Sequence, residues 1–312
     1  MSWQATLTNL YLRYRFKPAA GTRLVVATAR ARMSRLMRGQ KPIPADVLHQ
    51  AVPAQGGLCP AEWLRPADLS AQRTLLYFHG GGYFFGELAL HRPMCSYLSR
   101  IARADVLSVD YRLAPEHPCP AAVEDALAWY RELLTRIPAS QILIGGDSAG
   151  GGLALACLQQ AREAGLPMPA GIVLFSPWVD LACSGETMQT RARAEVMFSA
   201  DSLAQAAALY LNGRAMQDPL ASPLYADLSG LPPLLIYASR DEILLSDATR
   251  LHGRAEALGV QSTLRLQSGM PHVWPVMLML PEARASLREV AEFMRERVPD
   301  QGFGSATIQA IP

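Results

Sequence analysis

The chain has 312 residues, of which 50% are hydrophobic and 18% are charged, so it can bury the core of one large α/β domain and is not disordered as a whole. Its net charge of +2 gives no field that would indicate nucleic-acid binding, and no apolar run reaches the length of a membrane span, so we expect neither a nucleic-acid partner nor stable membrane insertion. Five cysteines without a CxxC pair indicate buried thiols rather than disulfides or zinc, and the first residues lack a secretory signal pattern, so we expect a cytoplasmic protein.

The first 41 residues form a basic segment, with nine Lys or Arg and no Asp or Glu. Within it, residues 24–37 space their apolar side chains as one face of a helix does. A basic amphipathic helix can bind an anionic membrane surface. Because this helix has no aromatic anchor, we favour a helix that packs across its own domain with its arginines in solvent, and weak membrane association stays open.

Beyond a proline-rich stretch near residues 41–60, short apolar runs alternate with helical patterns. The predicted strands are Thr74–Phe78, Val106–Val109, Gln141–Ile144, Gly171–Phe175, Leu234–Tyr237 and Thr263–Leu266. The predicted helices between and after them are Met94–Ala104, Ala121–Thr135, Gly150–Ala164, Asp247–Leu258 and Ala283–Val298. This alternation predicts a mostly parallel sheet covered by helices on both faces. The rhythm breaks between Pro177 and Pro232, where Ser199–Leu211 is predicted as an inserted helix over the carboxyl ends of the strands.

The glycine-rich segment Gly145–Gly152 follows a predicted strand and precedes a helix. Its GxSxG pattern, at Gly146, Ser148 and Gly150, is typical of a nucleophile elbow, where the serine backbone is strained and neighbouring Cβ atoms would collide. Ser148 would then lie at a helix N-terminus, which favours developing negative charge. The alternative is a glycine-rich turn without catalytic function. No GK[ST] follows, so a phosphate loop is excluded.

A second glycine-rich segment, His79–Gly86 (HGGGYFFG), directly follows the first predicted strand. Consecutive glycines can turn backbone amides toward one point in space, as an oxyanion hole requires. The alternative is a flexible loop, which the neighbouring aromatic residues make less favourable.

Together with Asp110–Pro118 (DYRLAPEHP), these two motifs resemble the bacterial hormone-sensitive-lipase-like esterases of the α/β-hydrolase fold. The resemblance covers about residues 70–295 and implies a carboxylic ester hydrolase with a Ser–Asp–His triad. It also implies one α/β-hydrolase domain over residues 1–312, with a helical cap from about 1–45 and about 185–218 and a catalytic core from about 46–184 and 219–299. By motif, the oxyanion-binding amides correspond to those of Gly81, Gly82 and Ala149. A homodimer formed through the last strand and helix is a further implication.

The acid and the histidine of such a triad follow the serine in chain order, each at the end of a strand. The family pattern places the acid at Asp241; Glu242 is adjacent and could serve, whereas Asp247 has the position of a helix N-terminal residue. His272 is the only histidine after the last predicted strand, and no histidine has metal-ligand spacing. We therefore expect Ser148, Asp241 and His272 to hydrolyse esters through an acyl-enzyme, without a metal or an organic cofactor.

Apolar side chains lie beside every predicted catalytic loop, and Tyr83, Phe84, Trp178 and Val273 are the candidate substrate-pocket residues. Such residues can form an apolar wall around a small-molecule ester, although each could equally belong to the core. With the cap, they predict short- to medium-chain carboxylic esters as substrates. The alternatives are a lactonase or an amidase of the same fold, or a catalytically weak ligand-binding relative.

Overall fold

The computed structural model describes residues 1–19, 21–37, 42–68 and 71–300. Its centre is an eight-stranded sheet in the order β1-β2-β4-β3-β5-β6-β7-β8. The first two strands pair antiparallel with their neighbours, and all other pairs are parallel. The strands are β1 (Val47–Val52), β2 (Ala61–Pro66), β3 (Arg73–Phe78), β4 (Ala104–Val109), β5 (Ile142–Asp147), β6 (Gly171–Phe175), β7 (Leu234–Ser239) and β8 (Ser262–Gln267).

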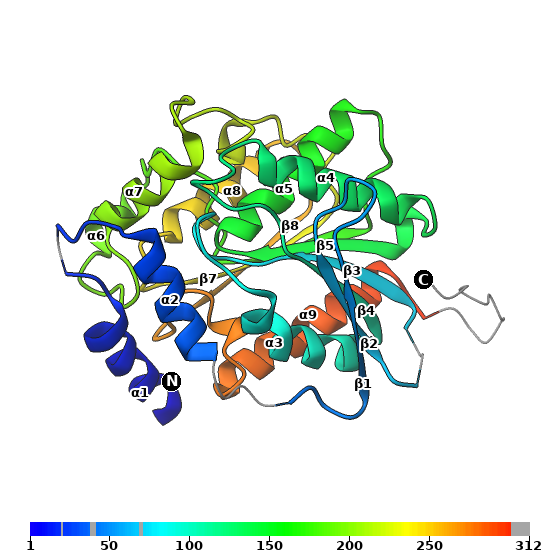
Figure 1. Cartoon of the computed structure of the whole chain (residues 1–312), viewed down its shortest axis with the longest axis horizontal. Coiled ribbons are helices and arrows are strands. Elements are labelled where there is room, and N and C mark those ends of the chain that lie inside the picture. The colour runs from blue at the N-terminus through cyan, green and yellow to red at the C-terminus, as the bar shows by residue number, and fades with distance from the viewer. Residues whose placement is uncertain (20, 38–41, 69–70, 301–312) are drawn as a thin grey trace.

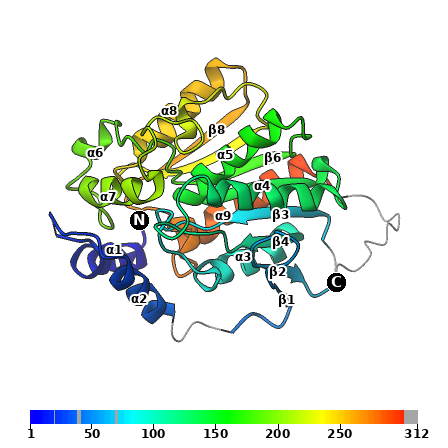
Figure 2. The same cartoon turned by 45° about the horizontal axis from the view of Figure 1, so that its top comes forward.

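Helices cover both faces of the sheet because successive residues of the central strands point to opposite sides. On β3, Leu75 and Tyr77 pack into one core with α3 (Leu88–Ala102) and α9 (Pro281–Arg297). Leu76 and Phe78 pack into the other core with the remaining core helices, which are α4 (Ala121–Leu134), α5 (Ala149–Glu163) and α8 (Leu245–Ala257). Figures 1 and 2 show the two helical layers. The predicted α/β-hydrolase fold is confirmed.

The remaining helices lie together at one side of the sheet (Figures 1 and 2). They are α1 (Trp3–Tyr11) with a following π-helical turn (Leu12–Phe16), α2 (Val26–Met37), α6 (Thr187–Thr190) and α7 (Ala200–Leu211). The π turn reaches the segment after α6 through Arg13, which donates to the carbonyls of Arg193 and Ala194. The start of α2 reaches α7 through the Leu24 amide, which donates to Gln205 at 2.7 Å.

All six predicted strands are confirmed to within a few residues, and so are the inserted helix α7 and the basic helix α2. Ser199 caps α7 in a reciprocal capping box with Ser202, the arrangement that makes a serine a helix-start signal. Among the longer elements of the described residues, β1, β2 and α1 were not predicted from the pattern. On β2, the carboxylate of Glu62 is buried and hydrogen-bonded to Arg92 and His49. A strand whose sequence contains charged residues therefore lies within the sheet.

Candidate active site

Ser148 lies in the sharp turn between β5 and α5, with φ 51° and ψ −121°. This unfavourable conformation is held by its own backbone: the amide donates to the Phe175 carbonyl at 2.8 Å, and the carbonyl accepts from the Trp178 amide at 2.9 Å. A Cβ on Gly146 or Gly150 would collide with neighbouring backbone. The strained serine between obligate glycines is the geometry of a nucleophile elbow.

The end of β6 brings Ser148 and His272 to the same region of the structure. Phe175 accepts the Ser148 amide, and the next residue, Ser176, accepts the amide of Val273 through its hydroxyl at 3.1 Å. Both Ser148 and His272 are buried. Among the described residues, the Ser148 hydroxyl has no hydrogen-bond partner, and Nε2 of His272 is also buried without one. Each group therefore retains the hydrogen-bonding capacity that a proton transfer needs.

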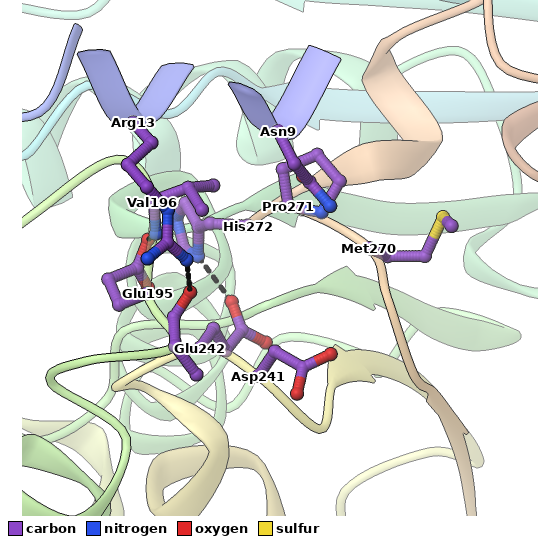
Figure 3. A pocket seen from close by; sticks show the side chains of 10 residues that line it. Asn9, Arg13, Glu195, Val196, Asp241, Glu242, Met270, Pro271 and His272 are labelled. Carbon is purple, nitrogen blue, oxygen red and sulfur yellow. Dashed lines mark hydrogen bonds and ion pairs between the residues drawn. The ribbon is translucent and has the colours of Figure 1, made fainter. Parts of the chain in front are cut away.

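The other ring nitrogen of His272 is bound by Glu242, not by the expected Asp241. Nδ1 lies 2.5 Å from Oε2 of Glu242, whose second oxygen accepts from the Ser239 amide at 2.8 Å. Figure 3 shows this contact and shows Asp241 pointing away from the ring. Asp241 accepts the Gly269 amide at 2.6 Å instead. The prediction of Asp241 as the carboxylate partner is wrong, because adjacent residues of the turn after β7 leave it in different directions.

The surroundings of His272 favour its charged form. Burial opposes protonation, but the hydrogen bond to Glu242 and the negative charges of Glu242 and Glu195 outweigh it and raise the pKa of His272 above its ordinary value. The ring edge of Phe198 also contacts the imidazole, with centroids 5.1 Å apart. Neither Glu195 nor Phe198 was predicted, since the segment before α7 carries no motif.

Glu195 connects this segment to the catalytic side of the site. Its Oε1 accepts the amides of the next two residues at 2.8 and 2.7 Å, and its Oε2 accepts the Ile243 amide at 3.1 Å. Ile243 directly follows Glu242, so Glu195 holds the backbone that carries the histidine's partner. Burial raises the pKa of Glu195.

A cavity of about 210 Å³ lies beside the Glu242 edge of the imidazole (Figure 3). Its walls come from α1 and the π turn, from the segment after α6 and from the loops after β7 and β8; the lining residues are Asn9, Arg13, Ala194, Glu195, Val196, Asp241, Glu242, Met270, Pro271 and His272. The α1 helix and its π turn therefore form one wall of this cavity.

The amides expected to bind an oxyanion are available. Among the described residues, the N–H groups of Gly81, Gly82 and Ala149 donate to no protein group. Gly81 and Gly82 have φ values of +127° and +59°, which residues with a Cβ rarely adopt. Ala149 is the first residue of α5, where a free amide and the helix dipole favour negative charge.

The glycine loop is attached to the elbow by Asp147, the residue before the serine. One oxygen of its buried carboxylate accepts the Gly80 amide at 2.9 Å and the Tyr77 hydroxyl at 2.8 Å, and it lies 3.0 Å from Nε2 of His91. Burial alone would raise the pKa of Asp147, but the charge and hydrogen bond of His91 lower it overall. Asp147 therefore fixes the loop to the nucleophile turn.

The four predicted pocket residues are all buried. The Tyr83 ring stacks on Tyr210 of α7 at 3.8 Å and lies 6.2 Å from Trp178, which is core packing between α7 and the elbow. Phe84 lies against Gly82, and the Val273 backbone is tied to β6. None of the four lines the cavity at His272.

Comparisons with known proteins extend the similarity well beyond these motifs. A family model described as the alpha/beta hydrolase fold matches residues 75–276. An acetyl-hydrolase of Streptomyces hygroscopicus is 46% identical over 77% of this chain and 80% of its own length, and Esterase LipU of Mycobacterium tuberculosis is 37% identical over 78% and 84%. The crystal structure of EstE5 soaked with p-nitrophenyl butyrate has a TM-score of 0.89 and 42% identity, covering 95% of this chain and 99% of that one. An esterase from the bacterial hormone-sensitive lipase family has a TM-score of 0.88 and 41% identity, covering 96% and 99%.

Proposed function

We propose that this chain, which belongs to the bacterial hormone-sensitive lipase family of α/β hydrolases and is a carboxylic ester hydrolase, forms its acyl-enzyme on Ser148. Nε2 of His272 removes the hydroxyl proton as the oxygen attacks the ester carbonyl. Glu242 holds the Nδ1–H tautomer and stabilises the imidazolium. The observation that carries this assignment is a buried imidazole with Glu242 on one nitrogen and, among the described residues, no partner on the other.

The amides of Gly81, Gly82 and Ala149 donate hydrogen bonds to the oxyanion of the tetrahedral intermediate and stabilise its negative charge. When the intermediate collapses, the imidazolium returns its proton to the leaving alcohol. Water then attacks the acyl-enzyme, His272 takes a proton from it, and the carboxylic acid leaves with Ser148 restored.

The test of the nucleophile is Ser148→Ala. Turnover of p-nitrophenyl butyrate should fall by roughly four to six orders of magnitude, and labelling by a fluorophosphonate probe should disappear. An unchanged melting temperature and circular dichroism spectrum would show that the fold is retained. A purified Ser148→Ala protein that still turns over the ester at the original rate would refute the assignment.

For the substrate, we propose short- to medium-chain esters, with the cap formed by α1, the π turn, α2, α6 and α7. Phe84 beside Gly82 and Phe198 against His272 support an apolar, closely bounded acyl site. A solved relative was soaked with p-nitrophenyl butyrate, which is consistent with this class. Rates on p-nitrophenyl esters of increasing chain length should peak at short acyl chains. Lactones and matched amides, assayed beside them, should react more slowly; a faster rate on either would replace the proposal.

A further inference from the structure

The first helix presents its apolar side to solvent rather than to the core. Trp3 is 69% exposed, Leu7 55%, Leu10 54%, Tyr11 51% and Tyr14 74%. Their spacing places them on one side of α1 and its π turn; we call these five residues the outer apolar face. Single exposed apolar residues need no explanation, but five on one helical face mark an interaction surface.

This orientation is set by polar contacts on the inner side of the helix. Ala5 and Leu12 are buried. The Ser2 hydroxyl donates to Glu282 at 2.9 Å, and the Asn9 side chain donates to the Gly269 carbonyl at 2.9 Å. Turning the outer apolar face inward would break these bonds, so its exposure is built into the fold.

Next to this face lies an open groove of about 670 Å³ between the π turn and α2. Three of its lining residues are arginines, Arg15, Arg32 and Arg35, and none is acidic. Arg32 lies over the Phe16 ring at 4.9 Å. Arg15 and Arg35 make no hydrogen bond or ion pair with any described residue. Within the part of the chain that the structure describes, these two guanidinium groups therefore have no counter-charge.

We propose that this side of the molecule docks on an anionic phospholipid surface, with the outer apolar face at the headgroup–acyl boundary and the arginine groove on lipid phosphates. Trp and Tyr are the residues that favour this boundary, and unpaired arginines match anionic headgroups. No helix of the described residues is long and apolar enough to span a membrane, so the contact is peripheral.

A second copy of the chain is a poorer occupant of the same face. A twofold interface would bring two identical arginine grooves together without an acidic residue between them, and like charges across an interface oppose association. The outer apolar face also lies on α1 and its π turn, whose Asn9 and Arg13 line the cavity at His272. Docking would therefore bring this side of the site to the lipid surface.

Flotation with vesicles tests the proposal. The protein should bind phosphatidylcholine vesicles containing about one-third phosphatidylglycerol at low salt, bind pure phosphatidylcholine much less, and be released by salt. Arg15→Gln with Arg35→Gln should weaken binding roughly fivefold for each arginine. Trp3→Gln with Leu7→Gln should weaken it at every salt concentration. The matched control is Arg131→Gln with Arg136→Gln on and beside α4, which should bind like the wild type.

Hydrolysis of soluble p-nitrophenyl butyrate should be unchanged in all these variants, so a failure of docking and a failure of the proposed mechanism would be told apart. Wild-type protein that does not float with anionic vesicles at low salt would overturn the proposal. So would equal loss of binding in the control pair. A dimer in analytical ultracentrifugation that Trp3→Gln with Leu7→Gln dissolves would assign the face to self-association instead.

Discussion

Glu242 and Asp241 are neighbours in the chain, but only Glu242 can hold the imidazole. Its two oxygens divide between His272 and the Ser239 amide. Glutamine at 242 would have to turn its NH₂ group toward one of two donors, since both Nδ1–H and the Ser239 amide donate. We therefore expect Glu242→Gln to lower kcat by roughly three to four orders of magnitude.

The matched control is Asp241→Asn, measured on the same ester. From the described residues its carboxylate accepts a single hydrogen bond, from the Gly269 amide, which an asparagine oxygen can also accept. Activity within about tenfold of the wild type is expected. A larger loss in Asp241→Asn than in Glu242→Gln would return the catalytic role to Asp241.

The protonation of His272 sets the acidic limit of activity. The general base must be neutral, and a raised pKa means that the ring keeps its proton to higher pH. In the pH profile of kcat/KM, the midpoint of the acidic limb should therefore lie above the ordinary histidine pKa of about 6.5. The charged groups that face the ring are Glu242, Glu195 and, in the elbow, Asp147. Glu195→Gln should shift the limb toward acid; an unshifted limb would show that Glu195 is neutral in the working enzyme.

At the scale of elements, the oxyanion loop and the elbow act as one unit through Asp147. Asp147→Ala removes the acceptor for the Gly80 amide, and a misplacement of about 1 Å costs roughly 100-fold in rate. We expect kcat to fall by about 10- to 100-fold with little change in KM. Weaker inhibition by a boronic acid, a mimic of the tetrahedral intermediate, should accompany it.

Asp147→Asn serves as the conservative comparison. Its side-chain oxygen can still accept the Gly80 amide and the Tyr77 hydroxyl, so it should recover most of kcat. If the asparagine variant is as impaired as the alanine variant while both fold normally, the charge beside His91 matters more than the anchoring of the loop.

The elements that the sequence predicted well are those whose burial follows a simple rule. Central parallel strands are buried on both faces and read as continuous apolar runs, so β3, β5 and β6 stand out. On β2, Glu62 needs partners from β1 and α3, which no local pattern reveals. α1 was missed because its apolar side faces solvent. The spacing of its apolar residues therefore does not indicate a helix that packs on the core.

The candidate site divides in the same way. The sequence singles out Ser148 and the oxyanion glycines because strained backbone and free amides require glycine at fixed offsets, and it singles out His272 because this is the only histidine after the last predicted strand. The carboxylate could not, because Asp241 and Glu242 are both acids at the end of β7 and only the turn geometry separates them. Glu195 and Phe198 approach from a distant insertion, so their role depends on tertiary structure alone.

For the whole molecule, buried ionisable groups make the free energy of unfolding depend on pH: a buried histidine opposes acid, and buried carboxyls oppose alkali. Burial and the neighbouring His91 lower the pKa of His79 to about 4, so the neutral ring that the fold requires costs stability as pH falls below about 6.5. Burial raises the pKa of Asp105 to about 6 and that of Asp247 to about 8. These carboxyls contribute most when protonated, and their contribution is lost as pH rises. The two trends oppose each other between about pH 4 and about pH 6.5, and at higher pH the loss from Asp247 remains.

Asp247 should dominate the alkaline side. One carboxylate oxygen accepts the amides of Val179 and Asp180, and the other is buried with no hydrogen-bond partner among the described residues. Ionisation therefore places a charge beside Asp180. The folded state holds the proton to about pH 8, whereas the unfolded chain releases it near 3.9, so stability falls as pH rises through this interval.

Asp247→Asn keeps an acceptor for both amides but cannot ionise. Calorimetry should therefore show a smaller drop in melting temperature between about pH 6 and about pH 9 for Asp247→Asn than for the wild type. The exposed Asp201→Asn should keep the wild-type drop, and an Asp247→Asn curve parallel to the wild type would mean that Asp247 is charged throughout.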